Sequence, residues 1–230
     1  MQGGYFSYAL LAALATALLV AAFTDIKRRE IDNWLNAAIA VAAPLWWLVT
    51  GYTWVEVALQ FGLAVATFLI TALLFAMRQM GGGDVKLLTA LALWFNASSF
   101  LQVIVMMALI GGGASVAMAF FNMRRVDGEV LRDVLAGVAA ALWVSFACAA
   151  VYSLMTRSPP VAPGMIATIG AAMPPPWVFA LALTAALGIL AFGLSHMLRR
   201  QKSRLPIPYG VAISLAGLWV LGEQALTAVS

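Results

Sequence analysis

Several uninterrupted apolar runs long enough to cross a lipid bilayer constrain this chain more than any other feature of its sequence. A helix needs roughly 20 consecutive apolar residues to span the hydrocarbon core. The chain of 230 residues is 64% hydrophobic and 10% charged, which is not the balance of a soluble protein. An apolar soluble helical core would not need runs of this length. We therefore predict an all-α polytopic protein embedded in a lipid bilayer, with residues 1–230 forming a single integral membrane domain.

The first apolar run, Tyr5 to Thr24, is predicted to be a retained membrane helix and not a secretory signal peptide. Its basic residues, Lys27 to Arg29, follow the run instead of preceding it. The run is also too long for the apolar region of a signal peptide. The helix should therefore have its N-terminus outside the cell and its C-terminal end in the cytoplasm.

The remaining apolar runs complete a topology of about eight spans. The stretch from Leu87 to Phe121 is too long for one helix, and Asn96 to Ser99 is the natural turn within it. The first helix of this stretch, Leu87 to Phe95, would barely cross without local thinning of the bilayer. The other predicted spans are Trp34 to Thr50, Trp54 to Met77, Val134 to Met155, Trp177 to Leu198, and Ile207 to Leu221 or beyond.

The positive charges agree with this count of spans. Starting outside, the eight-span topology places every Lys and Arg in a cytoplasmic loop except Arg157. Membrane proteins concentrate their basic residues on that side. Both termini are then predicted to lie outside. Because the small net charge of +4 is explained by topology, we expect no nucleic-acid partner.

Asp84 follows three glycines, Gly81 to Gly83, between two apolar runs. A carboxylate at the edge of hydrocarbon is costly to keep charged, so such an acid is a functional candidate. Glycine lets another backbone approach closely, so this run predicts a turn with room for a second chain beside the carboxylate.

Asp25 is the predicted partner of Asp84, because it ends the first helix on the same face of the membrane at a similar depth. Two carboxyls within hydrogen-bonding distance cannot both ionise, so one stays protonated while the other deprotonates a shared water. Such a pair titrates as a unit and suits amide hydrolysis. Two alternatives stay open: Asp25 belongs to a solvated interfacial cluster, or Asp32 is the true partner of Asp84.

The segments that hold these aspartates, Asp25 to Asn33 and Gly81 to Lys86, resemble the two signature segments of the type IV prepilin peptidases. These are membrane aspartic proteases of the GxGD class. Pro208 to Ile213 looks like the segment that opens their last helix. The chain is especially similar to the short CpaA/TadV-like branch, which serves Flp-type pili and lacks the cysteine-rich domain of the larger enzymes. The single cysteine, Cys148, agrees with that branch.

The resemblance implies an aspartic endopeptidase in the inner (cytoplasmic) membrane of a bacterium or archaeon. Its substrate would be a prepilin or pilin-like protein, cut after a glycine at the cytoplasmic membrane face. No metal and no other cofactor is expected. The implied site residues are the catalytic pair Asp25 and Asp84, the motif glycines Gly81 and Gly83, and Lys86 and Asn33 as residues that bind substrate or support the motifs.

The middle of the chain departs from the resemblance. Members of the family have six spans, whereas this chain has room for a further helical hairpin. We therefore predict a catalytic core of about residues 5–123 and 205–230, and an inserted hairpin of about residues 124–204.

Another class of protein explains intramembrane acids equally well. A proton-coupled membrane transporter would use Asp25 and Asp84 as proton carriers. It would also have polar groups near the bilayer midplane and paired halves, and neither is clear in this sequence. A catalytically silent membrane scaffold is a third possibility, and it would tolerate the loss of either aspartate.

Overall fold

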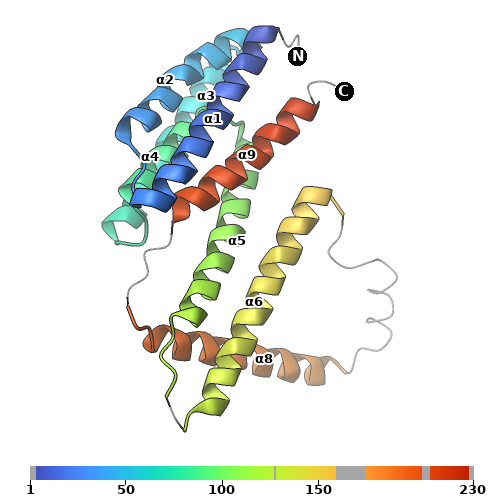
Figure 1. The fold of residues 1–230 in the computed structure, drawn as a ribbon. Helices are drawn as coiled ribbons and strands as arrows, with labels where there is room; N and C mark the ends of the chain where they lie inside the picture. The colour runs from blue at the N-terminus through green and yellow to red at the C-terminus, as the bar shows by residue number, and fades with distance from the viewer. Residues whose placement is uncertain (1–3, 127, 159–174, 204–207, 228–230) are drawn as a thin grey trace. The chain divides into compact units, whose positions relative to one another are not determined.

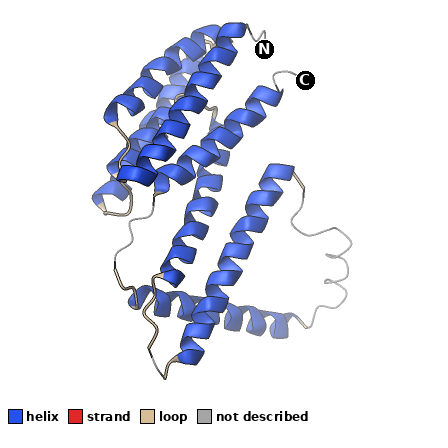
Figure 2. Cartoon of the chain, viewed as in Figure 1, coloured by secondary structure: helices blue, strands red, loops and turns tan. Residues whose placement is uncertain are grey.

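The computed structural model describes residues 4–126, 128–158, 175–203 and 208–227. Figures 1 and 2 show this part of the chain as helices joined by loops, without a strand. The prediction of an all-α polytopic protein is confirmed. The helices are α1 (Tyr5–Arg28), α2 (Asn33–Thr50), α3 (Trp54–Ala76), α4 (Gly82–Leu91), α5 (Ala97–Phe121), α6 (Val130–Thr156), α8 (Pro176–Arg199) and α9 (Tyr209–Thr227).

Every predicted span has a helix at its place, but two ends differ in a way that matters for the aspartates. Helix α1 continues past Thr24, so Asp25 lies in its last turn and not after it. Helix α4 begins at Gly82 and not at Leu87, so Asp84 lies in its first turn. The predicted helices stopped short at these two ends because the apolar runs excluded charged residues. Basic residues are nevertheless favourable at a helix C-terminus, and an acidic residue is favourable at an N-terminus.

Six of the described helices are long and apolar enough to cross a membrane: α1, α3, α5, α6, α8 and α9 up to Leu226. Helix α2 falls outside this group, and whether it crosses stays a prediction. Helix α4 has 10 residues, which is about 15 Å of helix, or half of a hydrocarbon core. The short span predicted over Leu87 to Phe95 therefore corresponds to a helix of residues 82–91 that is too short to cross a bilayer by itself.

The chain divides into two compact units, one of residues 1–108 with 208–230 and one of residues 109–207. In the first unit α1 packs against α2 and α9, and α4 packs against α2, α3 and α9. Helix α1 begins and α9 ends at the same end of this unit (Figure 1). The predicted core and inserted hairpin stay predictions, because a division by contacts does not test whether a segment was inserted.

Side chains from two neighbouring helices satisfy the backbone where α4 ends. The amide Nε2 of Gln60 on α3 donates to the carbonyl oxygens of Ala92 at 2.7 Å and Phe95 at 2.5 Å. The indole of Trp47 on α2 donates to the carbonyl of Leu93 at 2.8 Å. These three carbonyls belong to residues that directly follow Leu91, the last residue of α4, where no further turn of helix supplies partners. These bonds therefore allow α4 to end inside an apolar bundle.

The second unit has its own small core, formed mainly by α6 and α8. Gly193 of α8 lies so close to α6 that a Cβ at this position would come within 2.8 Å of the Cβ of Ala139. Met123, Ala136, Ala140 and Met197 form a buried cluster. The packing therefore depends on small residues at the crossing of the helices, as is common in membrane proteins.

Candidate active site

Asp25 and Asp84 are both buried in the first unit, with 6% and 9% of their surfaces exposed. Asp25 comes from the last turn of α1, and Asp84 from the first turn of α4. Two helices that are distant in sequence thus bury their carboxyls in the same unit. The two groups are close enough for the charge of Asp25 to act on Asp84.

The first turn of α9 holds the Asp25 carboxyl. The backbone N–H of Val211 donates to Oδ2 of Asp25 at 3.2 Å. A Cβ on Gly210 would lie 2.8 Å from the same oxygen, which is closer than real Cβ atoms approach. Glycine at this position therefore lets the backbone of α9 reach the carboxyl. A helix N-terminus and its N–H groups favour a negative charge, so this contact offsets part of the cost that burial imposes on a charged Asp25.

The carboxyl of Asp84 lies against the backbone of Gly81, the residue that precedes α4. A Cβ on Gly81 would lie 3.0 Å from Oδ2 of Asp84. Asp84 lies outside the six membrane-spanning helices. Its pKa is raised to about 6, first by burial and then by the negative charge of Asp25, against the lowering effect of the Gly81 amide. Asp84 is thus the carboxyl that retains its proton more readily than an ordinary aspartate.

Ile31, in the connection between α1 and α2, lies between the glycines of two helices. A Cβ on Gly83 of α4 would come within 3.3 Å of the Cβ of Ile31, and one on Gly210 of α9 within 2.7 Å of its Cδ1. Ile31 is buried. This side chain therefore joins the segment after Asp25 to the starts of α4 and α9, and it needs both glycines to fit.

The other predicted site residues lie nearer the solvent. Nζ of Lys86 donates to Oδ1 of Asn33 at 2.6 Å, in an exposed contact between α4 and α2. Asp32, the rival partner of Asp84, forms an ion pair with Arg28 at 2.7 Å. The geometry therefore couples Asp84 electrostatically to Asp25 and gives Asp32 an exposed partner of its own.

Sequence reasoning did not assign a role to Ile31, Gly210 or Val211. Gly210 and Val211 belong to a segment that was noted only for its resemblance. Their contacts join residues separated by most of the chain, so no local pattern reports them. Asn36 and Ser214 are buried residues of the same unit whose side-chain polar atoms have no hydrogen-bond partner within the described residues. Buried polar groups are normally paired, which makes these two residues notable.

Within the described ranges no three His, Cys, Asp or Glu side chains converge in a way that could hold a metal ion. The chemistry available from the described side chains is that of two buried carboxyls with different environments. One is supported by helix N–H groups, and the other has a raised pKa. An acid and a base beside one another can hold a water molecule and act on a carbonyl group.

The fold defines a multi-pass membrane protein that buries one aspartate at the end of α1 and another at the start of α4. A comparison with protein families matches residues 12–116 to the Type IV leader peptidase family. The matched segment contains both aspartates and the glycine motif, so this part of the chain is similar to a family of peptidases. The family predicted from the motifs is confirmed, whereas the CpaA/TadV-like branch stays a prediction. No match was found among curated proteins or solved structures.

Proposed function

We propose that this chain is an aspartic endopeptidase that removes the leader of prepilin-like proteins at the cytoplasmic face of the inner membrane. The observation that carries the proposal is the joint burial of Asp25 and Asp84, at the ends of two helices within the segment that matches the leader peptidases. The cut would follow a glycine, between the basic leader and the apolar helix of the substrate.

The environments of the two carboxyls support different roles. The N–H of Val211 offsets part of the cost of burying a charge on Asp25, and we assign Asp25 as the general base because Asp84 is the better proton holder of the two in this proposal. The raised pKa of Asp84 supports its protonated form, so Asp84 is the general acid.

The proposed reaction is direct hydrolysis of a peptide bond. Asp25 takes a proton from water while the water oxygen forms a bond to the carbonyl carbon, and Asp84 gives its proton to the carbonyl oxygen. The tetrahedral intermediate then collapses, with return of that proton to Asp84. The carbon–nitrogen bond breaks, and the leaving nitrogen takes the proton held by Asp25.

The substrate backbone must lie close to both carboxyls. Gly81 lies next to the Asp84 carboxyl, and Gly210 lies next to the Asp25 carboxyl. Neither glycine has a side chain that would keep a peptide away. An extended peptide is recognised mainly through its backbone, so small residues at this place suit a leader segment. Lys86 and Asn33, which bond to each other at an exposed position, are proposed to support this region or contact the substrate.

Cleavage by the purified chain in detergent tests the proposal. The substrate is a prepilin with a basic leader and a glycine before its apolar helix, and the products are identified by mass spectrometry. We expect Asp25→Ala and Asp84→Ala, made separately, each to lower the rate by roughly 10²–10⁴-fold. Asp32→Ala is the matched control and should cleave normally. The dyad is refuted if Asp25→Ala cleaves normally or if only Asp32→Ala is inactive.

A measurement of proton flux distinguishes the transporter alternative from the endopeptidase. The protein is reconstituted in liposomes that contain a pH-sensitive dye, and a proton gradient is imposed. The endopeptidase proposal expects the same leak for wild type and Asp84→Asn. Proton flux that depends on Asp84, together with absent cleavage, would favour the transporter.

A further inference from the structure

A pocket with three cationic side chains lies in the second unit. Its volume is 520 Å³, and its lining residues are Phe121, Met123, Arg124, Arg125, Val126 and Lys202. They come from the end of α5, the connection to α6, and the segment after α8. We propose that this pocket binds the phosphate headgroup of an anionic phospholipid, and the proposal does not depend on the proposed peptidase activity.

Backbone hydrogen bonds hold the two chain segments of the pocket together. The N–H of Arg124 donates to the carbonyl of Arg200 at 2.8 Å, and the N–H of Lys202 donates to the carbonyl of Asn122 at 3.0 Å. Between them Met123 and Gln201 form an antiparallel bridge. The cations of the pocket are therefore carried by a defined backbone structure and not by independent loops.

Side-chain amides reinforce the same junction. Nδ2 of Asn122 donates to Oε1 of Gln201 at 2.9 Å and to the carbonyl of Ser203 at 2.7 Å. Nε2 of Gln201 donates to the carbonyls of Ala119 at 2.9 Å and Met197 at 2.7 Å. Both segments are thus tied to the helices that precede them, which places their cations at the ends of α5 and α8.

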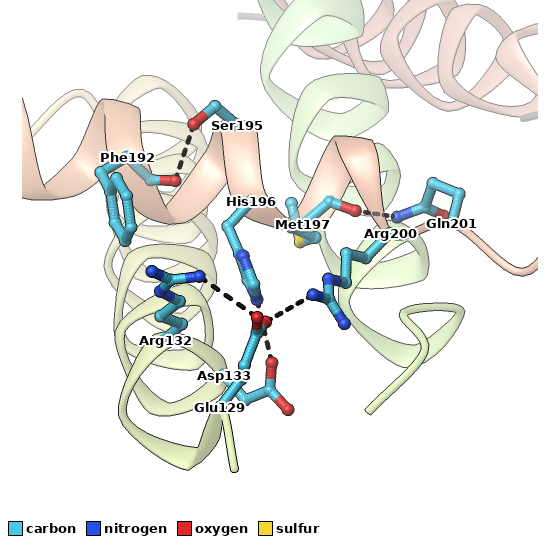
Figure 3. A network of polar contacts seen from close by, with 9 residues as sticks. All are labelled: Glu129, Arg132, Asp133, Phe192, Ser195, His196, Met197, Arg200 and Gln201. Carbon is cyan, nitrogen blue, oxygen red and sulfur yellow. Dashed lines mark hydrogen bonds and ion pairs between the residues drawn. The ribbon is translucent and has the colours of Figure 1, made fainter. Parts of the chain in front are cut away.

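The nearby carboxylates are engaged with other side chains. Figure 3 shows Glu129 and Asp133 facing the end of α8. Glu129 pairs with Arg132 at 3.2 Å and with Arg200 at 2.6 Å, and His196 approaches Asp133 at 3.0 Å. In the part of the chain that the structure describes, no carboxylate forms an ion pair with the three cations of the pocket. Their positive charge is available to an anion from outside.

The apolar lining decides between a lipid and a soluble anion. Phe121 is 80% exposed and Val126 is 47% exposed, so both present apolar surface beside the cations. The pocket lies where two apolar helices of membrane-spanning length end, on the face predicted to be cytoplasmic. Basic pockets at this position suit the headgroups of anionic lipids, with apolar surface against the acyl chains.

Displacement of a fluorescent phosphatidylglycerol from the purified full chain in detergent tests the site. Unlabelled dioleoyl phosphatidylglycerol should compete about tenfold more strongly than dioleoyl phosphatidylcholine. The variant R124Q/R125Q/K202Q should weaken phosphatidylglycerol binding about tenfold or more, since each basic residue near an anionic surface contributes several-fold in affinity. The matched control K27Q/R78Q/R199Q removes three other charges predicted to lie on the same face and should retain binding.

Four outcomes would overturn the proposal. First, the two lipids could compete equally. Second, the control variant could lose as much affinity as the pocket variant, which would indicate that the cations only set topology. Glycerol phosphate or inorganic phosphate could displace the probe as well as the lipid does, which would indicate a soluble ligand. Polyglutamate could displace it better, which would indicate an acidic protein. Circular dichroism confirms folding, and the single variants R125Q and K202Q replace the triple variant if it does not fold.

Discussion

The backbone N–H of Val211 donates a hydrogen bond of 3.2 Å to Oδ2 of Asp25, which joins the start of the last helix to the end of the first. The neighbouring Gly210 lets the two helices approach, because a side chain there would collide with the carboxyl. The last helix therefore takes part in the site although it lies outside the segment that matches the family.

Gly210→Ala should impair cleavage more than a comparable change elsewhere on α9. The added Cβ would lie 2.8 Å from Oδ2 of Asp25 and 2.7 Å from Cδ1 of Ile31, so the carboxyl must move. A displacement of a catalytic group by about 1 Å can cost roughly 10²-fold in rate. We expect kcat/KM to fall about 10- to 100-fold. Gly222→Ala, on the same helix with open space around it, is the control. Equal activity of the two variants would contradict the assigned role of Gly210.

The first two glycines of the motif should differ in their tolerance of alanine. A Cβ on Gly81 would lie 3.0 Å from the Asp84 carboxyl, whereas one on Gly82 would make an ordinary contact of 3.4 Å with the ring of Phe75. We expect Gly81→Ala to lower kcat/KM about tenfold or more, and Gly82→Ala to change it less than about threefold. Cleavage rates of the two variants, measured with the same prepilin, test this order, and the reverse order would be incompatible with it.

The raised pKa of Asp84 predicts a loss of stability with rising pH. The protonated folded state is favoured, so the contribution is complete below the ordinary value of 3.8 and is lost as pH rises through about 6. Asp84→Asn cannot ionise and should be more stable than wild type at pH 7, by on the order of a few kcal/mol. Thermal unfolding in detergent between pH 4 and about 7 measures the difference. Asp32→Asn is the control, and a constant difference between wild type and Asp84→Asn across this range would refute the linkage.

Gln60→Leu should destabilise the end of α4. It removes both hydrogen bonds to the buried carbonyls of Ala92 and Phe95, and each unpaired carbonyl costs about 1–3 kcal/mol. Gln79→Leu, at an exposed position after α3, is the control. We expect a clearly lower Tm in detergent only for Gln60→Leu, with faster amide exchange in α4. An unchanged Tm would mean that other groups satisfy these carbonyls.

Much of the helical framework could be predicted from residue order. Apolar runs of membrane length require backbone hydrogen bonding within each segment, which leaves helices as the solution, and glycine or polar residues interrupt the runs. The predicted bounds erred near Asp25 and Asp84: the first helix continues past Thr24 to Arg28, and the fourth begins at Gly82 and not at Leu87. A run of apolar residues indicates which part of a helix contacts the bilayer, but it does not indicate at which residue the helix ends.

The amino-acid sequence by itself determined the helices and the two acidic motifs, because hydrophobic run length and residue type are local properties. Only the tertiary structure decided that the charge of Asp25 reaches Asp84, that α9 contacts Asp25 through Val211, and that Ile31 fits between Gly83 and Gly210. These contacts depend on how closely separate helices pack. That distance is set by the shape of facing side chains far apart in the sequence, and no local pattern encodes it.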